Sequence, residues 1–133
     1  MFIFLELEQV HRIHQRALER HGGAAGLRDS GLVESAIASA ANTFFYGNGD
    51  VWDVAAAYAF HLAEAQAFLD GNKRVGLAAA ITFLDMNFPM PPASFESEMQ
   101  CCDAMIAIAR HEMTKADLAA LFRRLFGGRN NGE

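Results

Sequence analysis

Two apolar runs of the chain are joined by the sequence Gln66-Ala67-Phe68-Leu69-Asp70-Gly71-Asn72-Lys73-Arg74-Val75-Gly76-Leu77. The runs, residues 53–65 and 75–85, have the composition of helices, whereas the segment between them gathers a carboxylate, an amide and two cations around Gly71. Glycine permits positive φ, and Asp70 or Asn72 can cap the helix that follows. The sequence therefore predicts two helices joined by a short polar loop.

The predicted start of the second helix is chemically suited to phosphate. The first N–H groups of a helix lack intrahelical partners and lie at the positive end of the helix dipole, where many proteins bind anions. Lys73 and Arg74 add full positive charge there, and Asp70 offers the hard oxygen ligand that Mg²⁺ prefers. The same residues also suit an ordinary capped helix with a basic first turn, so local chemistry alone leaves both interpretations open.

Composition places the chain among globular proteins of one domain. It has 133 residues, of which 52% are hydrophobic and 20% are charged, so it is long enough to bury a substantial core. We expect a single domain over residues 1–126 and a polar tail over residues 127–133. The formal net charge of −5 argues against general nucleic-acid binding, which typically needs a basic surplus. Any phosphate site must therefore be local.

Three further features indicate a cytoplasmic protein. The longest largely apolar run, residues 75–84, is too short to cross a bilayer, so we expect no membrane association. The first five residues lack the basic segment of a signal peptide, and Glu6 follows them directly. Cys101 and Cys102 are adjacent and poorly placed to bridge one another, so we expect both to be reduced thiols.

Apolar spacing predicts an all-α bundle of about six helices. The expected helices span residues 7–20, 32–42, 51–65, 73–85, 94–110 and 114–126. The helix over residues 73–85 is apolar nearly all round, which predicts that it lies at the centre of the bundle. Asp50, and Thr114 with Asp117, are typical of helix N-terminal caps. A proline-bearing loop is expected over residues 88–92.

Several residues outside this segment allow two interpretations. Residues 43–49 are aromatic and then turn-rich, which favours a short flap or hairpin; alternatively, their aromatic side chains fill the core. Arg28 is expected either to face the active site or to pair with a neighbouring acid. His11 and His14 lie three residues apart, as metal ligands can, but nothing nearby completes a metal site, so we expect a surface or core-edge pair. We expect a structural role for His61.

The segment 66–74 resembles the signature of the Fic/Doc family, His-x-Phe-x-(Asp/Glu)-(Gly/Ala)-Asn-(Lys/Gly)-Arg. The matching residues are Phe68, Asp70, Gly71, Asn72, Lys73 and Arg74. Residues 21–36, with His-Gly-Gly followed by Gly-Leu-Arg-Asp-x-Gly-Leu-x-Glu-Ser-Ala, are also similar to the death-on-curing (Doc) branch, and the resemblance covers about residues 7–125. It implies a compact fold of about six helices, in which a flap beside the active site, here residues 43–49, aligns the target chain.

The resemblance also implies roles for individual residues. Asp70 would bind Mg²⁺ on the phosphates of a nucleoside triphosphate such as ATP, and Arg74 would clamp a phosphate. Asn72 and the backbone from Gly71 to Lys73 would form an anion hole. Phe68 would pack under the loop as a wedge. These residues together would form a nucleotide site with a magnesium carboxylate.

Lys73 selects the Doc branch within this resemblance. Members of that branch transfer the terminal phosphate to a threonine of elongation factor Tu and stop translation, whereas family members with glycine at this position transfer AMP. A Doc toxin is encoded with an antitoxin, Phd, whose C-terminal segment folds into a groove on the toxin. The expected function is therefore that of a toxin in a toxin–antitoxin pair. The alternatives are a Fic-type AMP transferase and a catalytically silent module that binds a nucleotide or a partner.

Gln66 departs from the signature, because the family's catalytic histidine falls at this position. That histidine accepts the proton of the target hydroxyl, and glutamine has no basic nitrogen. Loss of a general base typically lowers the rate by about 10²–10⁴-fold and leaves binding intact. We therefore expect Gln66 to impair catalysis, whether it is an engineered replacement, the mark of a naturally silent relative or part of an altered mechanism.

Overall fold

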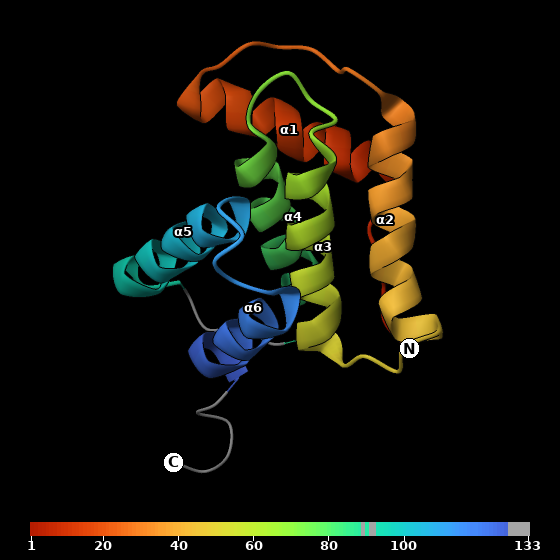
Figure 1. Cartoon of the computed structure of the whole chain (residues 1–133), viewed down its shortest axis with the longest axis vertical. Coiled ribbons are helices and arrows are strands. Elements are labelled where there is room, and N and C mark those ends of the chain that lie inside the picture. The colour runs from red at the N-terminus through yellow and green to blue at the C-terminus, as the bar shows by residue number, and fades with distance from the viewer. Residues whose placement is uncertain (89, 91–92, 128–133) are drawn as a thin grey trace.

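The computed structural model describes residues 1–88, 90 and 93–127, and in these it contains six α-helices and a final π-helical turn (Figure 1). Their bounds are α1 Leu7–His21, α2 Ser30–Phe45, α3 Val51–Ala65, α4 Asn72–Asn87, α5 Phe95–Ala109, α6 Lys115–Phe122 and η1 Arg123–Gly127. The described residues contain one isolated β-bridge and no sheet, which confirms the all-α prediction. No helix among them is both long and apolar enough to span a membrane. The predicted loop 88–92 and tail 127–133 lie largely outside the described residues.

Side-chain caps set the starts of most helices. Asp50, Ser94 and Thr114 each accept a hydrogen bond, 2.9–3.0 Å long, from the backbone N–H three residues later. Helix α2 begins two residues earlier than predicted because the Asp29 side chain caps it through the Gly31 N–H. The predicted helix starts are therefore confirmed to within two residues.

Helix α3 is more enclosed than α4. Most α3 residues are buried, and the helix packs against α2, α4 and α6. Fewer than half of the α4 residues are buried, because its first turn is polar and one face, with Leu77 and Ile81, is half-buried. The two helices approach closely at Gly76, where an added Cβ would lie 2.5 Å from the Ala59 carbonyl oxygen. The predicted central helix is thus one of a pair, and α3 is the more buried member.

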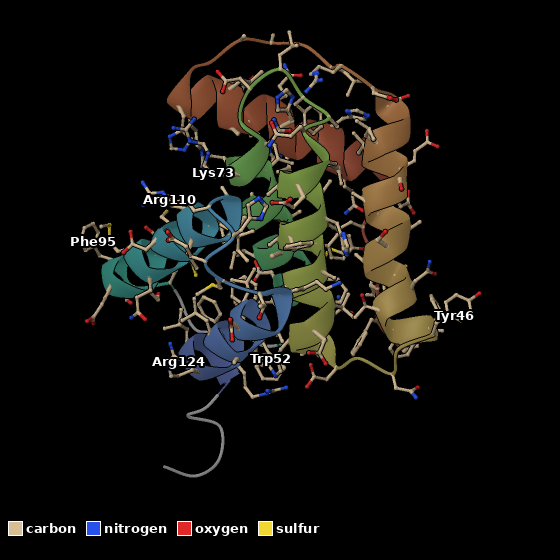
Figure 2. All side chains as sticks on the ribbon, in the orientation of Figure 1. Tyr46, Trp52, Lys73, Phe95, Arg110 and Arg124 are labelled. Atoms are coloured by element: carbon tan, nitrogen blue, oxygen red, sulfur yellow. The ribbon has the colours of Figure 1, made fainter. Side chains whose placement is uncertain are left out.

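Residues 43–49 form no flap, and the prediction of one beside the active site is wrong. Residues 43–45 continue α2, and the chain turns at Tyr46 before α3 begins. This turn precedes α3, whereas the segment 66–71 follows it, so the fifteen residues of α3, or about 22 Å, separate them. In Figure 2, Tyr46 accordingly lies low on the right and Lys73 higher on the left. The aromatic run followed by glycines does end in a turn, but α2 extends to Phe45 before that turn begins.

The alternative interpretation of residues 43–49, that their aromatic side chains fill the core, is correct for Phe44. Its ring lies 5.0 Å from that of Phe2, which in turn packs edge-to-face against Phe83 of α4. The N-terminal segment is also held by the Leu5 N–H, which donates a 2.9 Å hydrogen bond to the Tyr58 hydroxyl. Burial raises the pKa of Tyr58 to about 12, so this hydroxyl stays neutral. Non-helical residues at the start of the chain therefore close one side of the core.

Candidate functional site

The loop between α3 and α4, residues 66–71, is here called the site loop. It lies at one end of the bundle, beside α1 and the connection from α1 to α2 (Figure 1). A residue of positive φ stands at each end: Gln66, with φ 54°, ends α3, and Gly71, with φ 82°, precedes α4. The glycine was expected to adopt such a conformation, whereas a non-glycine residue rarely does. The reversal of the chain here thus depends on an unusual backbone at Gln66.

The segment that lies beside the site loop is residues 22–29, not 43–49. Leu27 and Phe68 form an antiparallel β-bridge, in which the Leu69 N–H donates to the Gly26 carbonyl at 3.1 Å. Gly26 has φ 143°, a conformation that residues with a Cβ rarely adopt, so glycine suits this position. The glycines of residues 22–31 indicate in the sequence that this segment can approach another part of the chain closely. They do not indicate that the site loop is the part that it contacts.

Phe68 and Asn72 anchor the site loop to the core. The Phe68 ring is 2% exposed and stacks on the ring of His14, with 3.9 Å between centroids and 20° between planes. The Asn72 Oδ1 accepts from the Phe68 N–H at 3.1 Å, and its Nδ2 donates to the Phe68 carbonyl at 3.0 Å. Phe68 packs under the loop as expected. Because both polar atoms of the Asn72 side chain bond to the Phe68 backbone, the group of Asn72 that remains for an anion is its main-chain N–H.

The first turn of α4 has no side-chain cap. Its N-cap residue is Gly71, and the predictions that Asp70 or Asn72 would cap it are wrong because both side chains bond elsewhere. The first intrahelical bond is donated by Val75, and within the described part of the chain no acceptor pairs with the N–H groups of residues 72–74. These groups lie at the positive end of the helix dipole, an arrangement that suits an anion.

Charged side chains surround this helix start. Lys73 and Arg74 are exposed, and neither forms a salt bridge with any residue that the structure describes. The Asp70 carboxylate is also exposed and accepts hydrogen bonds from the Gly71 N–H at 2.9 Å and the Ala24 N–H at 3.3 Å. A carboxylate has further acceptor positions, so Asp70 can still bind a cation. Mg²⁺ in proteins is often held by a single carboxylate together with substrate phosphates and several waters. The exposed Asp70 carboxylate suits such a role.

Gln66 forms hydrogen bonds through both its side chain and its main chain. Its Nε2 donates a 3.0 Å hydrogen bond to the Ala63 carbonyl in the last turn of α3, and its own carbonyl accepts one of 3.0 Å from Arg28 Nη1. Arg28 therefore faces the site loop, which was the first of its two expected positions. The Gln66 amide can hydrogen-bond a hydroxyl but cannot accept its proton at accessible pH.

Two histidines have separate roles. His14, only 7% exposed, places Nε2 3.1 Å from the Asp70 carbonyl oxygen, so it is a site residue that sequence analysis did not identify. His61 lies elsewhere on α3, and its Nε2 is 3.1 Å from Lys115 Nζ of α6. Burial and the Lys115 charge lower the pKa of His61. An ammonium group can only donate, so this Nε2 accepts, and His61 takes the structural role expected of it.

A cavity of about 500 Å³ opens beside the site loop. It lies between α1 and residues 25–27, and its walls include His11, His14 and Phe68. His11 contacts Phe68 edge-to-face, with 5.9 Å between ring centroids. Phe68 is the residue of the site loop that lines this cavity.

Comparison with known proteins agrees with this geometry. The model of the Fic/DOC family matches residues 4–84, which include the whole site loop and its neighbours. The chain is 30% identical over 121 residues to the protein kinase doc of Escherichia phage P1, covering 90% of this chain and 93% of that protein. It is 36% identical over 101 residues to the toxin Doc of Mycolicibacterium smegmatis, covering 74% and 77%. The chain belongs to the Fic/DOC family.

Proposed function

We propose that this protein is a toxin of the Doc type that transfers the terminal phosphate of a nucleoside triphosphate, with ATP as the expected donor, to a protein hydroxyl. The observation that supports this most directly is the uncapped start of α4, flanked by Lys73, Arg74 and Asp70. One relative is named a protein kinase and the other a toxin. The expected target is elongation factor Tu in the cytoplasm, and the expected result is arrest of translation.

The phosphates of the donor would bind at the first turn of α4. The N–H groups of residues 72–74 point towards the start of the helix and donate to phosphate oxygens, while Lys73 and Arg74 balance their charge. Asp70 is the residue that would hold Mg²⁺, which supplies positive charge to the phosphates. The site loop keeps these groups in fixed positions, so binding requires little rearrangement.

Transfer needs a base, and the glutamine at position 66 does not supply one. The target hydroxyl oxygen attacks the terminal phosphorus, the bond to the leaving nucleoside diphosphate breaks, and the hydroxyl proton must pass to an acceptor. Gln66 stands where the family has histidine and can only orient the hydroxyl. The chain as it stands should therefore bind nucleotide and target but turn over slowly.

Replacement of Gln66 by histidine tests the enzyme directly. We expect inducible expression of Gln66→His to stop growth and to add one phosphate to a cellular protein, detected by mass spectrometry, whereas the Gln66 chain does neither. Gln66→His combined with Asp70→Ala is the matched control and should be silent. If the Gln66→His protein is neither toxic nor modifying, the proposed enzyme is wrong, and a silent binding module is favoured. Addition of AMP would instead show the Fic-type reaction, against which Lys73 argues by resemblance.

We further propose that an antitoxin segment of the Phd type covers one face of α5. Phe95, Met99 and Ile106 are 78%, 47% and 43% exposed, and their spacing places them on one side of the helix. Phe95 projects from the start of α5 away from the bundle (Figure 2). An amphipathic helix is the type of partner that such an apolar strip accepts.

Co-expression with the product of the neighbouring reading frame tests this surface. Met99→Glu should weaken the complex at least tenfold, since it puts a charge into an apolar contact. Phe45→Glu, an equally drastic change of an exposed residue at the end of α2, should leave the affinity unchanged. Equal affinities for both variants would place the antitoxin elsewhere.

A further inference from the structure

The two ends of the site loop are each held by a side chain from outside α3 and α4. Arg28, in the connection between α1 and α2, donates from Nη1 to the Gln66 carbonyl at 3.0 Å. His14, on α1, has Nε2 3.1 Å from the Asp70 carbonyl oxygen. A carbonyl oxygen can only accept, so this Nε2 carries the hydrogen. Both donors therefore bind the main-chain carbonyls of residues whose side chains take part in the proposed reaction.

These carbonyls belong to the peptide groups that decide the path of the loop. The first carbonyl is that of Gln66, whose own φ is 54°. The second is that of Asp70, which is followed by Gly71 with φ 82°. A left-handed conformation is unfavourable for a non-glycine residue, so the conformation at Gln66 depends on the contacts made around it. Rotation of either peptide group would redirect the side chain of Gln66 or Asp70. Donors fixed on these carbonyls select one arrangement.

The residues that carry the two donors are anchored, His14 by its ring and Arg28 by its backbone. The His14 ring is 7% exposed and stacks on Phe68, so it has little freedom to turn. The backbone of Arg28 is fixed because its N–H and that of Asp29 both donate to the Ala67 carbonyl, at 2.7 and 3.3 Å. The His14 ring and the Arg28 backbone are thus fixed before a ligand binds, and the exposed Arg28 side chain reaches the loop from this fixed point.

We infer that His14 and Arg28 are positioning residues, which set where the side chains at positions 66 and 70 point without contacting the substrate. The inference rests on the proposed phosphate transfer. A displacement of about 1 Å at a reacting group can lower a rate by as much as roughly 10²-fold. The loss of either donor should accordingly reduce turnover more than it reduces nucleotide binding or fold stability.

The kinetic test uses the Gln66→His protein. Arg28→Met removes the donor and keeps the length of the side chain, while His14→Phe keeps the stack on Phe68 and removes the hydrogen bond. Each should lower kcat by about 10–100-fold with the KM for ATP and the Tm nearly unchanged. Arg28→Lys and His14→Gln, which retain a donor, should recover part of the loss. Arg12→Met is the control, since Arg12 is an exposed residue of α1 that pairs only with Glu8 among the described residues.

A second measurement does not depend on activity. Backbone ¹⁵N relaxation of the Gln66 chain should show increased motion of the amides of residues 66–71 in Arg28→Met and in His14→Phe, but not in Arg12→Met. If the Gln66→His protein transfers no phosphate, the proposed function fails and this measurement still tests the inference. Unchanged relaxation of the loop, or a loss of kcat that only follows a loss of Tm, would overturn it.

Discussion

Helices α3 and α4 begin in opposite ways. At the start of α3, Asp50 and Asp53 cap one another's backbone N–H groups at 2.9 Å, and the Arg123 guanidinium pairs with Asp50. At the start of α4, Gly71 supplies no cap, and the charged residues nearby bond to other groups or to solvent. Side chains at the start of α3 thus accept from two of its N–H groups, whereas in the described residues no side chain accepts from the first N–H groups of α4.

This difference separates a structural helix start from a functional one. Both carry charged residues within one turn, so charge density alone does not distinguish them. What distinguishes them is whether a side chain of the protein occupies the N–H groups. The start of α4 can be left open because α4 is secured elsewhere, by its close contact with α3 and by the amide of Asn72.

The contact that secures α4 should show the largest stability effect. Gly76→Ala places a Cβ 2.5 Å from the Ala59 carbonyl, so α3 and α4 must move apart. We expect a loss of roughly 3 kcal/mol in the free energy of unfolding, measured by urea denaturation. Ala78→Gly, on the same helix, should cost only about 0.5–1 kcal/mol. Equal losses would mean that α4 is held chiefly by other contacts.

The open helix start should show its effect in binding. Asp70→Ala and Arg74→Ala are each expected to weaken Mg²⁺–ATP binding by roughly 10–100-fold in calorimetry, because each removes a charged partner of the nucleotide. Asp50→Ala, at the capped start of α3, should leave this affinity unchanged. Identical affinities in all of these proteins would show that the two helix starts do not differ in function.

Removing the cap at the start of α3 should lower the stability of the fold and leave nucleotide binding unchanged. Asp50→Ala is expected to lower the free energy of unfolding by about 1 kcal/mol. Partial burial would raise the pKa of Asp50, but hydrogen bonds from Asp53 and the Arg123 charge together hold it below its usual value of 3.8. A carboxyl whose pKa is lowered on folding stabilises the fold above its unfolded pKa, and the stabilisation is lost as pH falls below about 3.8. The difference in Tm between the two proteins should therefore shrink in strong acid.

The smallest expected effect concerns the side of α3 that faces α6. The pKa of His61 is lowered by burial and by Lys115, so the unfolded chain binds its proton more tightly than the folded one. Protonation of His61 therefore favours the unfolded chain. The free energy of unfolding is unaffected above about pH 6.5 and decreases as pH falls below that value. Lys115→Met should raise the pKa of His61, followed by NMR, and weaken the acid dependence. An unchanged titration would rule out the contact between these two residues in solution.

Much of the fold could be predicted because it depends on local patterns. Apolar spacing gave the helices, and Asp50 with Asp53 and Thr114 with Asp117 form the capping arrangements that mark helix starts. The error at residues 43–49 arose because aromatic residues and glycines suit both a hairpin and the end of a helix. Here the helix continues to Phe45, and the turn lies far from the site loop.

The candidate site could be predicted only in part. The residues of the signature are contiguous, so Phe68, Asp70 and Arg74 were identified from the sequence. The sequence left the position of Arg28 open between two alternatives and did not assign His14 to the loop, because their contacts join positions 38 and 56 residues apart. Nor could the sequence show that Asn72 uses its side chain on Phe68 instead of as a cap, since both uses need the same amide group.

The bridge between Leu27 and Phe68 has a consequence for the order of folding. Helices α3 and α4 are neighbours in sequence and can pair early, whereas the site loop takes its final shape only when α1 and residues 24–29 have closed over it. Contacts between distant parts of a chain form late because loop closure costs entropy. A partly folded chain that lacks this closure would therefore contain the helices but not the site. The proposed activity would appear only with the last step of folding and would be the first property lost when the fold opens locally.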